Sequence, residues 1–80
     1  MSLIKKKGGL MERRTVGSSS LTSMGYDSRS ETLEVEFTNG AVYQYYNVPL
    51  TLYEAFIAAA SKGQFYNSQI KDAFPYARVA

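Results

Sequence analysis

The sequence predicts a small α+β domain in which a short antiparallel β-meander packs against one main helix. Three observations support this fold class. Residues 32–37 alternate between apolar and polar side chains, as half-buried strands do. Asn39-Gly40 follows at once, and this dipeptide is the strongest short-range signal for a hairpin. Residues 51–63 then combine a helix-start signal with apolar side chains at helical spacing.

The expected meander has three strands, and Asp27 opens a turn-rich break between the first two. In the second strand, apolar side chains occupy one face, while Glu34 and Glu36 lie on the other. We interpret the two glutamates as a solvated strand face rather than as a catalytic acid–base pair. The three strands are expected at residues 21–26, 32–37 and 41–46.

The hairpin after the second strand allows two registers. A two-residue turn leaves Tyr43 and Tyr45 on the glutamate face of the sheet. A three-residue loop with Gly40 as the bulge residue pairs Phe37 with Ala41 and places both tyrosines on the apolar face. We favour the bulged loop because it buries two large aromatic side chains, which makes the tyrosine pair core first and binding surface second.

The main helix is expected to begin with a capping box, in which Thr51 is the N-cap and Glu54 follows three residues later. Phe56 and Ile57 lie on its broad apolar stripe, and we interpret them as core residues rather than a ligand wall. Lys62-Gly63 supplies a basic side chain and a glycine that predict the helix end.

The remaining chain predicts a short second helix within residues 64–71, with Ile70 and either Phe65 or Tyr66 turned inward. A proline then ends it, and residues 76–79 are expected to return to the sheet as a C-terminal edge strand.

The charge is divided unevenly along the chain. Residues 1–14 carry a net charge of +4 and residues 15–80 carry −2, so the pI of about 9.0 mainly describes the N-terminus. We expect residues 1–15 to be a flexible basic leader and residues 16–80 to be a single domain. The leader is either an arm that binds phosphates or a solvated terminus without a specific role, and we favour the second. Met11 also offers a second start.

The composition excludes several kinds of chemistry. The chain has no cysteine and no histidine, so it cannot form a disulfide, a thiolate nucleophile or the common zinc, haem and copper sites. No apolar run is long enough for a signal peptide or a membrane span. We therefore expect a cytoplasmic protein that is not an enzyme, with no metal, no cofactor and no membrane partner.

Several short motifs follow one another in a set order along residues 16–79. They are Ser19-Ser20-Leu21, Gly25-Tyr26-Asp27, Leu33-x-Val35-x-Phe37, Asn39-Gly40-x-x-Tyr43-x-Tyr45, Val48-Pro49, Ala60-Ser61-Lys62-Gly63-x-Phe65-Tyr66-Asn67-x-x-Ile70 and Pro75-Tyr76-x-Arg78. This ordered series resembles the KTSC family, a short domain named for the C-terminus of some lysyl-tRNA synthetases. Members also occur as free-standing small bacterial and phage proteins. The function of the family is not established, and the synthetase connection implies an RNA-binding module.

RNA is accordingly the first expected partner. Seven tyrosines and four phenylalanines offer rings on which unpaired bases could stack. The candidate residues for binding nucleic acid are Tyr43, Tyr45 and Tyr66 for stacking and Lys62, Lys71 and Arg78 for phosphates. The alternative is a protein–protein interaction or homodimer, formed through a free sheet face and the edge strand. The resemblance alone ranks RNA above protein.

Overall fold

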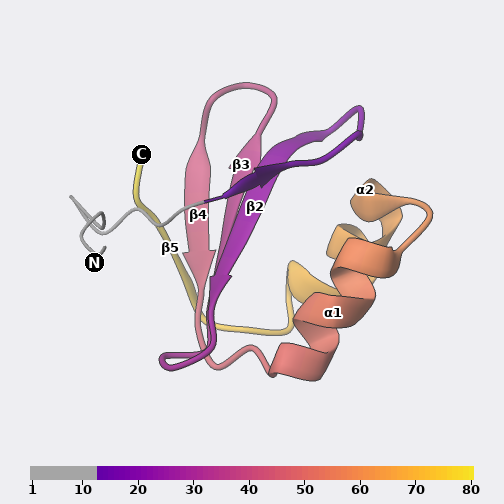
Figure 1. Ribbon diagram of the computed structural model, residues 1–80. Coiled ribbons are helices and arrows are strands. Elements are labelled where there is room, and N and C mark those ends of the chain that lie inside the picture. Colours follow the sequence, from indigo (N-terminus) through magenta and orange to yellow (C-terminus); the bar gives the residue numbers. More distant parts are fainter. Residues whose placement is uncertain (1–12) are drawn as a thin grey trace.

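The computed structural model describes residues 13–80 as a five-stranded antiparallel sheet with its helices gathered on one side (Figure 1). Neighbouring strands in the sheet are also neighbours in the sequence, so the predicted α+β meander is confirmed. Most of the expected leader, residues 1–12, lies outside the described part of the chain. The elements in chain order are β1 (Arg14–Thr15), β2 (Leu21–Asp27), β3 (Thr32–Phe37), β4 (Val42–Tyr45), α1 (Leu50–Ala58), α2 (Lys62–Phe65), η3 (Tyr66–Ile70, a π-helical turn) and β5 (Tyr76–Arg78).

The short strand β1 was not expected. Arg14 pairs with Met24 and Thr15 pairs with Ser23 along the edge of β2, although we assigned both β1 residues to the leader. Two residues are too few to show an alternating pattern, so the sequence carried no strand signal here. The sheet therefore starts earlier in the chain than the expected boundary at residue 15.

The β3–β4 hairpin adopts the bulged register that we favoured. Val35 lies opposite Tyr43, and the Phe37 amide donates to the Ala41 carbonyl over 2.9 Å. Gly40 has a φ of 92°, a backbone conformation that glycine adopts without a Cβ clash. Tyr45 consequently points to the helix side of the sheet, where it is only 2% exposed.

The start of α1 differs from the predicted capping box. The helix begins at Leu50, and among the described residues no side chain caps its first turn. Instead, the amides of Leu52 and Tyr53 both donate to the carbonyl of Pro49, at 3.0 and 3.2 Å. Pro49 is thus the N-cap residue in an extended conformation, and its carbonyl accepts the first hydrogen bonds of the helix without a threonine cap.

The end of α1 also differs from the prediction. The chain leaves the helix at Ala59, which is extended with a ψ of 138°, and Lys62-Gly63 opens α2 instead of closing α1. Ser61 caps α2 by accepting a hydrogen bond from the Gln64 amide over 3.3 Å. Serine followed three residues later by glutamine is itself a helix-start signal, and it identifies this boundary correctly.

The predicted second helix and edge strand are both present, as α2 with η3 and as β5. Ile70 is fully buried, as expected. We expected either Phe65 or Tyr66 to face inward with it, and both side chains are partly buried against the core. Phe56 is also fully buried and stacks on Phe65 with ring centroids 5.1 Å apart, which confirms its predicted place in the core. The buried cluster comprises Leu21, Met24, Leu33, Val35, Tyr45, Val48, Phe56 and Ile70.

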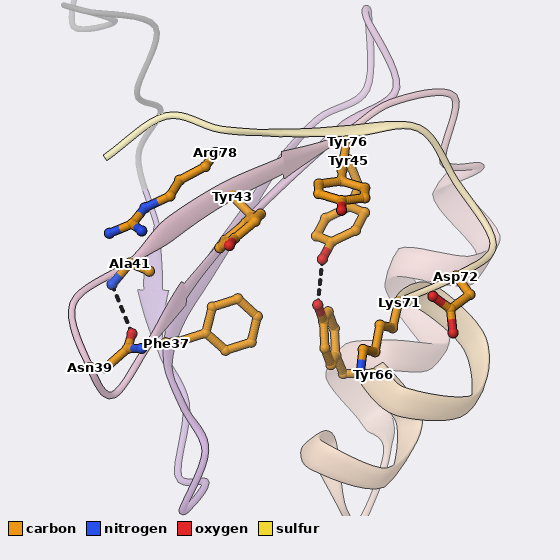
Figure 2. Close-up of a pocket in the computed structure, with 10 residues that line it drawn as sticks. All are labelled: Phe37, Asn39, Ala41, Tyr43, Tyr45, Tyr66, Lys71, Asp72, Tyr76 and Arg78. Atoms are coloured by element: carbon orange, nitrogen blue, oxygen red, sulfur yellow. Dashed lines mark hydrogen bonds between the residues drawn. The ribbon is translucent and has the colours of Figure 1, made fainter.

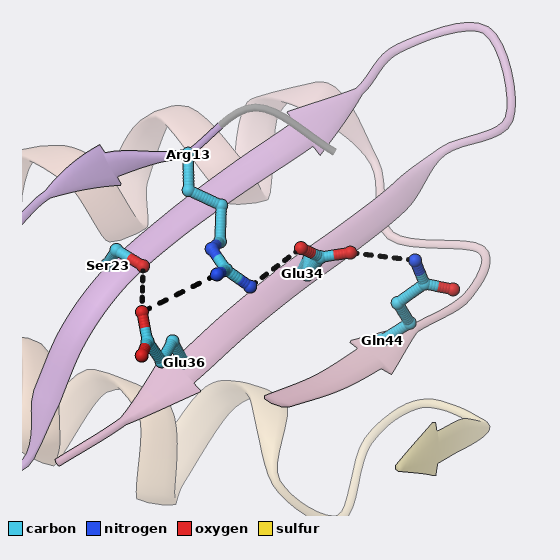
Figure 3. Close-up of polar contacts among 5 residues, drawn as sticks. All are labelled: Arg13, Ser23, Glu34, Glu36 and Gln44. Carbon is cyan, nitrogen blue, oxygen red and sulfur yellow. Dashed lines mark hydrogen bonds and ion pairs between the residues drawn. The ribbon is translucent and has the colours of Figure 1, made fainter. Parts of the chain in front are cut away.

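The face of the sheet opposite the helices differs from the solvated face that we predicted. We expected Glu34 and Glu36 to be solvated, but the side chain of Glu34 is 0% exposed. Arg13 lies between the two carboxylates, 2.7 Å from Glu34 and 3.5 Å from Glu36 (Figure 3). Gln44 also donates to Glu34 over 2.8 Å, and Ser23 donates to Glu36 over 2.9 Å. This polar network buries charge on a strand face where alternation alone predicts exposure.

Candidate functional site

A cavity of about 350 Å³ opens between the C-terminal edge of the sheet and the end of η3 (Figure 2). We call it the tyrosine pocket because four of its lining side chains are tyrosines. The lining residues are Phe37, Asn39, Ala41, Tyr43, Tyr45, Tyr66, Lys71, Asp72, Tyr76 and Arg78.

The sheet positions one side of the tyrosine pocket. Tyr43 and Tyr45 are two residues apart on β4, so their side chains share the face that the helices cover. The β4–β5 register places Arg78 opposite Tyr43 and Tyr76 opposite Tyr45. The edge strand thus adds one ring and one cation directly beside the tyrosine pair.

The π-helical turn η3 positions the other side of the pocket. Tyr66 begins this turn, and the Lys71 amide donates to the Tyr66 carbonyl over 2.9 Å. Because this hydrogen bond closes a turn of five residues, Lys71 lies one turn beyond Tyr66 and both line the same cavity. Such π-helical turns occur frequently at functional sites.

The aromatic rings of the pocket contact one another directly. The Tyr43 and Tyr76 ring centroids are 5.8 Å apart, and those of Tyr45 and Tyr76 are 5.5 Å apart. Phe37 meets Tyr43 and Tyr66 edge to face, at 5.7 and 5.1 Å. These separations lie within the range of favourable aromatic pairs, so the rings form one continuous aromatic wall.

The hydroxyl groups of Tyr45 and Tyr66 are hydrogen-bonded to each other across the pocket (Figure 2). Burial is the main cause that raises the pKa of both hydroxyls above 10.0, and the hydrogen bond to Tyr66 raises the pKa of Tyr45 further. Both tyrosines therefore remain neutral at physiological pH. The hydrogen bond ties β4 to η3 and holds the two sides of the pocket together.

Two cations and one carboxylate lie at the rim. Lys71, Arg78 and Asp72 are all exposed, and Asp72 is the single acidic residue among the described residues that line the pocket. Arg78 donates from Nε to the Ala80 carbonyl over 2.8 Å, which orients its guanidinium. The rim therefore carries a net positive charge beside neutral aromatic rings.

A protein-family model described as the KTSC domain matches residues 17–74, which is most of the chain. The chain belongs to the KTSC domain family. The crystal structure of a KTSC domain protein from Yersinia pestis is similar to it, with 37% sequence identity and a TM-score of 0.82. That similarity covers 86% of this chain and 97% of the Yersinia chain, so the fold of the whole domain is shared.

Relatives of this KTSC domain occur both as small proteins and within a much longer one. An uncharacterized protein from Stutzerimonas stutzeri is 44% identical over 61 residues, which cover 76% of this chain and 86% of that protein. A lysine–tRNA ligase from Trichormus variabilis is 44% identical over 55 residues, or 69% of this chain. The matched segment spans 10% of the length of that ligase.

The tyrosine pocket of this KTSC domain brings together five of the six residues that the sequence singled out for nucleic-acid binding. They are Tyr43, Tyr45, Tyr66, Lys71 and Arg78. The sixth, Lys62, lies outside the pocket and donates from Nζ to the Ala59 carbonyl over 2.8 Å, so its ammonium stabilises the end of α1.

Sequence reasoning missed several lining residues, among them Tyr76, which is 58% exposed. The sequence predicted an edge strand at residues 76–79, but it did not predict the register that places Tyr76 opposite Tyr45. Asn39 was interpreted only as a turn residue, and Asp72 carried no signal. Within residues 13–80, no acidic cluster could hold a metal ion, and no helix could cross a membrane.

Proposed function

We propose that this KTSC domain is a non-catalytic module that binds single-stranded RNA in the tyrosine pocket. The observation that supports this function best is that one cavity combines accessible tyrosine rings, one exposed and two half-buried, with the cations of Lys71 and Arg78. Sites for unpaired nucleic acid combine these same two elements, aromatic rings for the bases and cations for the backbone.

The rings differ in what they can offer a base. Tyr76 is 58% exposed on the edge strand, and Tyr43 and Tyr66 are half-buried beside it, so a base can stack on this part of the wall. Tyr45 is nearly fully buried, and we assign it a supporting role rather than direct stacking. A base that stacks on an aromatic side chain contributes about 1–3 kcal/mol of binding free energy.

The electrostatics of the pocket favour an anionic ligand. The raised pKa of Tyr66 keeps its hydroxyl neutral, so the ring adds no negative charge near a phosphate. On the far face of the sheet, Arg13 lies against both Glu34 and Glu36, so it offsets part of the negative charge that would repel RNA. Binding should weaken as the salt concentration rises, with a shallow log–log slope, because each phosphate contact contributes only about 0.7 to the slope and few cations line the pocket.

The relatives point in the same direction. A domain similar to this one forms part of proteins named lysine–tRNA ligase, and that name specifies an RNA substrate. An RNA partner also fits the cytoplasmic location that we expect from the sequence. We propose binding rather than catalysis, because the raised pKa values of Tyr45 and Tyr66 keep both hydroxyls protonated, so neither can act as a base at physiological pH.

The test is a fluorescence-anisotropy titration of labelled oligouridine, about 12 nucleotides long, with the full chain at about 50 mM salt. We expect saturable binding, and Tyr76→Ala should weaken it about tenfold because one stacking ring is lost. The absence of any binding by the unaltered protein at this salt concentration would refute the proposal.

Tyr46→Ala is the matched control for this titration. Tyr46 is half-buried, lies outside the pocket lining and donates to Gln44 over 3.1 Å, on the glutamate side of the sheet. We expect its loss to leave RNA affinity unchanged while circular dichroism shows a folded domain. Equal weakening by Tyr46→Ala and Tyr76→Ala would locate binding elsewhere.

A protein partner or homodimer is the second candidate, and the free edge of β5 favours it. Within the described chain, β5 pairs with β4 alone, and all three of its residues are exposed. An exposed edge strand can accept another strand by backbone hydrogen bonding. Size-exclusion chromatography with light scattering tests self-association, and a strictly monomeric mass across the micromolar range would exclude the homodimer.

A further inference from the structure

We infer that the tyrosine pocket holds one internal nucleotide of an unpaired strand, whose two flanking phosphates are bound by Arg78 and Lys71. This inference rests on the proposed RNA binding and adds which part of the strand occupies the pocket. It depends on the placement of the two cations, on their free charge and on the size of the cavity.

The two cations lie at different ends of the aromatic wall. Arg78 belongs to the edge strand β5, whereas Lys71 directly follows η3. Figure 2 shows their side chains on opposite sides of the row of tyrosine rings, with Tyr43, Tyr66 and Tyr76 between them. A base on these rings therefore has a cation on either side, which matches a phosphate before and after it in a strand.

Both cations have charge available for a ligand. The hydrogen bond of Arg78 to Ala80 uses Nε, and within residues 13–80 its two terminal nitrogens make no ion pair. The ammonium of Lys71 likewise makes no ion pair with any described residue. A guanidinium held through Nε can present its terminal nitrogens to phosphate oxygens in a bidentate geometry.

Two of the basic residues outside the pocket are already engaged with the protein. Arg13 lies against two carboxylates on the far face of the sheet, and Lys62 donates to the Ala59 carbonyl. The pocket therefore combines stacking rings with two uncommitted cations. Asp72 follows Lys71 on the rim, and its negative charge disfavours any phosphate at that end beyond the one that Lys71 binds.

The cavity has room for one nucleotide rather than several. Its volume of about 350 Å³ is close to the lower limit of ligand sites, which span roughly 300–1,000 Å³. One base with its sugar fits such a space. The strand then continues out of the pocket on both sides, past Arg78 at one end and Lys71 at the other. A terminal nucleotide would engage only one of the two cations.

The experiment titrates the full ¹⁵N-labelled chain by NMR with uridine, its 5′-monophosphate, its 3′-monophosphate and its 3′,5′-bisphosphate. At about 50 mM salt we expect the bisphosphate to bind about tenfold more tightly than either monophosphate. Arg78→Gln should abolish the advantage of one phosphate, and Lys71→Gln should abolish that of the other. The two variants should therefore rank the monophosphates in opposite orders.

Oligouridine provides the second measurement. The salt dependence of its binding should become shallower by about 0.7 in the log–log slope for Arg78→Gln and for Lys71→Gln. Arg29→Gln is the matched control, since Arg29 is exposed in the β2–β3 turn and does not line the pocket, and its slope should be unchanged.

The outcomes separate this inference from the proposed function. If the unaltered chain binds neither oligouridine nor a nucleotide, the proposed function fails and this inference fails with it. If oligouridine binds but the bisphosphate gains nothing over the monophosphates, only the inference is overturned. The same holds if both variants remove the contribution of one and the same phosphate, or if no nucleotide shifts the pocket resonances.

Discussion

The guanidinium of Arg13 donates a hydrogen bond to the carboxylate of Glu34 over 2.7 Å (Figure 3). The contact joins the first described residue to β3, the middle strand of the sheet, 21 positions further along the chain. Glu34 is fully buried, and a buried carboxylate is tolerated only when it is paired and hydrogen-bonded. Arg13, which directly precedes β1, is thus part of the folded domain, and its charge stabilises the buried carboxylate of Glu34.

Arg13→Ala should lower the free energy of unfolding by about 3 kcal/mol, because it removes a cation from a buried carboxylate. Urea unfolding at pH 7 measures this loss. Arg14→Ala is the control, since Arg14 is exposed in β1 and its replacement should change stability by no more than about 0.5 kcal/mol. Equal losses for both variants would show that the pair with Glu34 contributes nothing particular.

Gly40→Ala should destabilise the domain by about 1–2 kcal/mol, because Gly40 has a φ of 92° in the hairpin bulge. A Cβ at this position meets no atom within 4 Å, so the cost comes from the backbone conformation and not from crowding. Gly17→Ala is the control, since its Cβ is equally unobstructed and its φ is not positive. Thermal unfolding should show a lower midpoint for Gly40→Ala only, and matching midpoints would contradict the strained turn.

Tyr45 should make the stability of the domain fall at alkaline pH. Burial raises its pKa above 10.0, the value that a tyrosine has in the unfolded chain. Above pH 10 the unfolded state loses the proton while the folded state keeps it, so stability is full below pH 10 and decreases as the pH rises further. The slope for one retained proton is about 1.4 kcal/mol per pH unit.

Urea unfolding of the unaltered chain and of Tyr45→Phe between about pH 9 and 11 measures this dependence. The phenylalanine variant should lose stability less steeply above pH 10. Parallel curves for the two proteins would mean that Tyr45 has the same pKa in the folded and unfolded states.

Lys62→Gln should leave the affinity for oligouridine within about twofold, whereas Lys71→Gln should weaken it by several-fold at low salt. Lys62 is occupied with the Ala59 carbonyl and lies outside the tyrosine pocket, while Lys71 lines it. Anisotropy titrations of the two variants in parallel make the comparison. A larger loss for Lys62→Gln would return this residue to the binding surface and move the site toward α2.

The sequence was sufficient for features that depend on near neighbours in the chain. Alternation placed β3, and the preference for burying Tyr43 and Tyr45 correctly selected the bulged hairpin. These predictions succeed because strand alternation and turn geometry are decided within a few residues. The family resemblance was also available from ordered motifs, and a matching family model confirms it.

The sequence did not predict the contacts that a side chain makes with segments far away in the chain. Alternation placed Glu34 on the face away from the helices, but contacts from other segments, among them those of Arg13 and Gln44, bury it in a polar network on that face.

The pocket depends on tertiary structure in the same way. Tyr76 lines the pocket because the β4–β5 register places it opposite Tyr45. Lys62 lies outside the pocket because α1 ends earlier than predicted and the ammonium of Lys62 donates to the Ala59 carbonyl. The sequence by itself therefore determined the strands, the hairpin and most of the candidate binding residues. Tertiary structure decided which charges are buried and which side chains share a cavity, because packing brings together residues whose local patterns carry no information about one another.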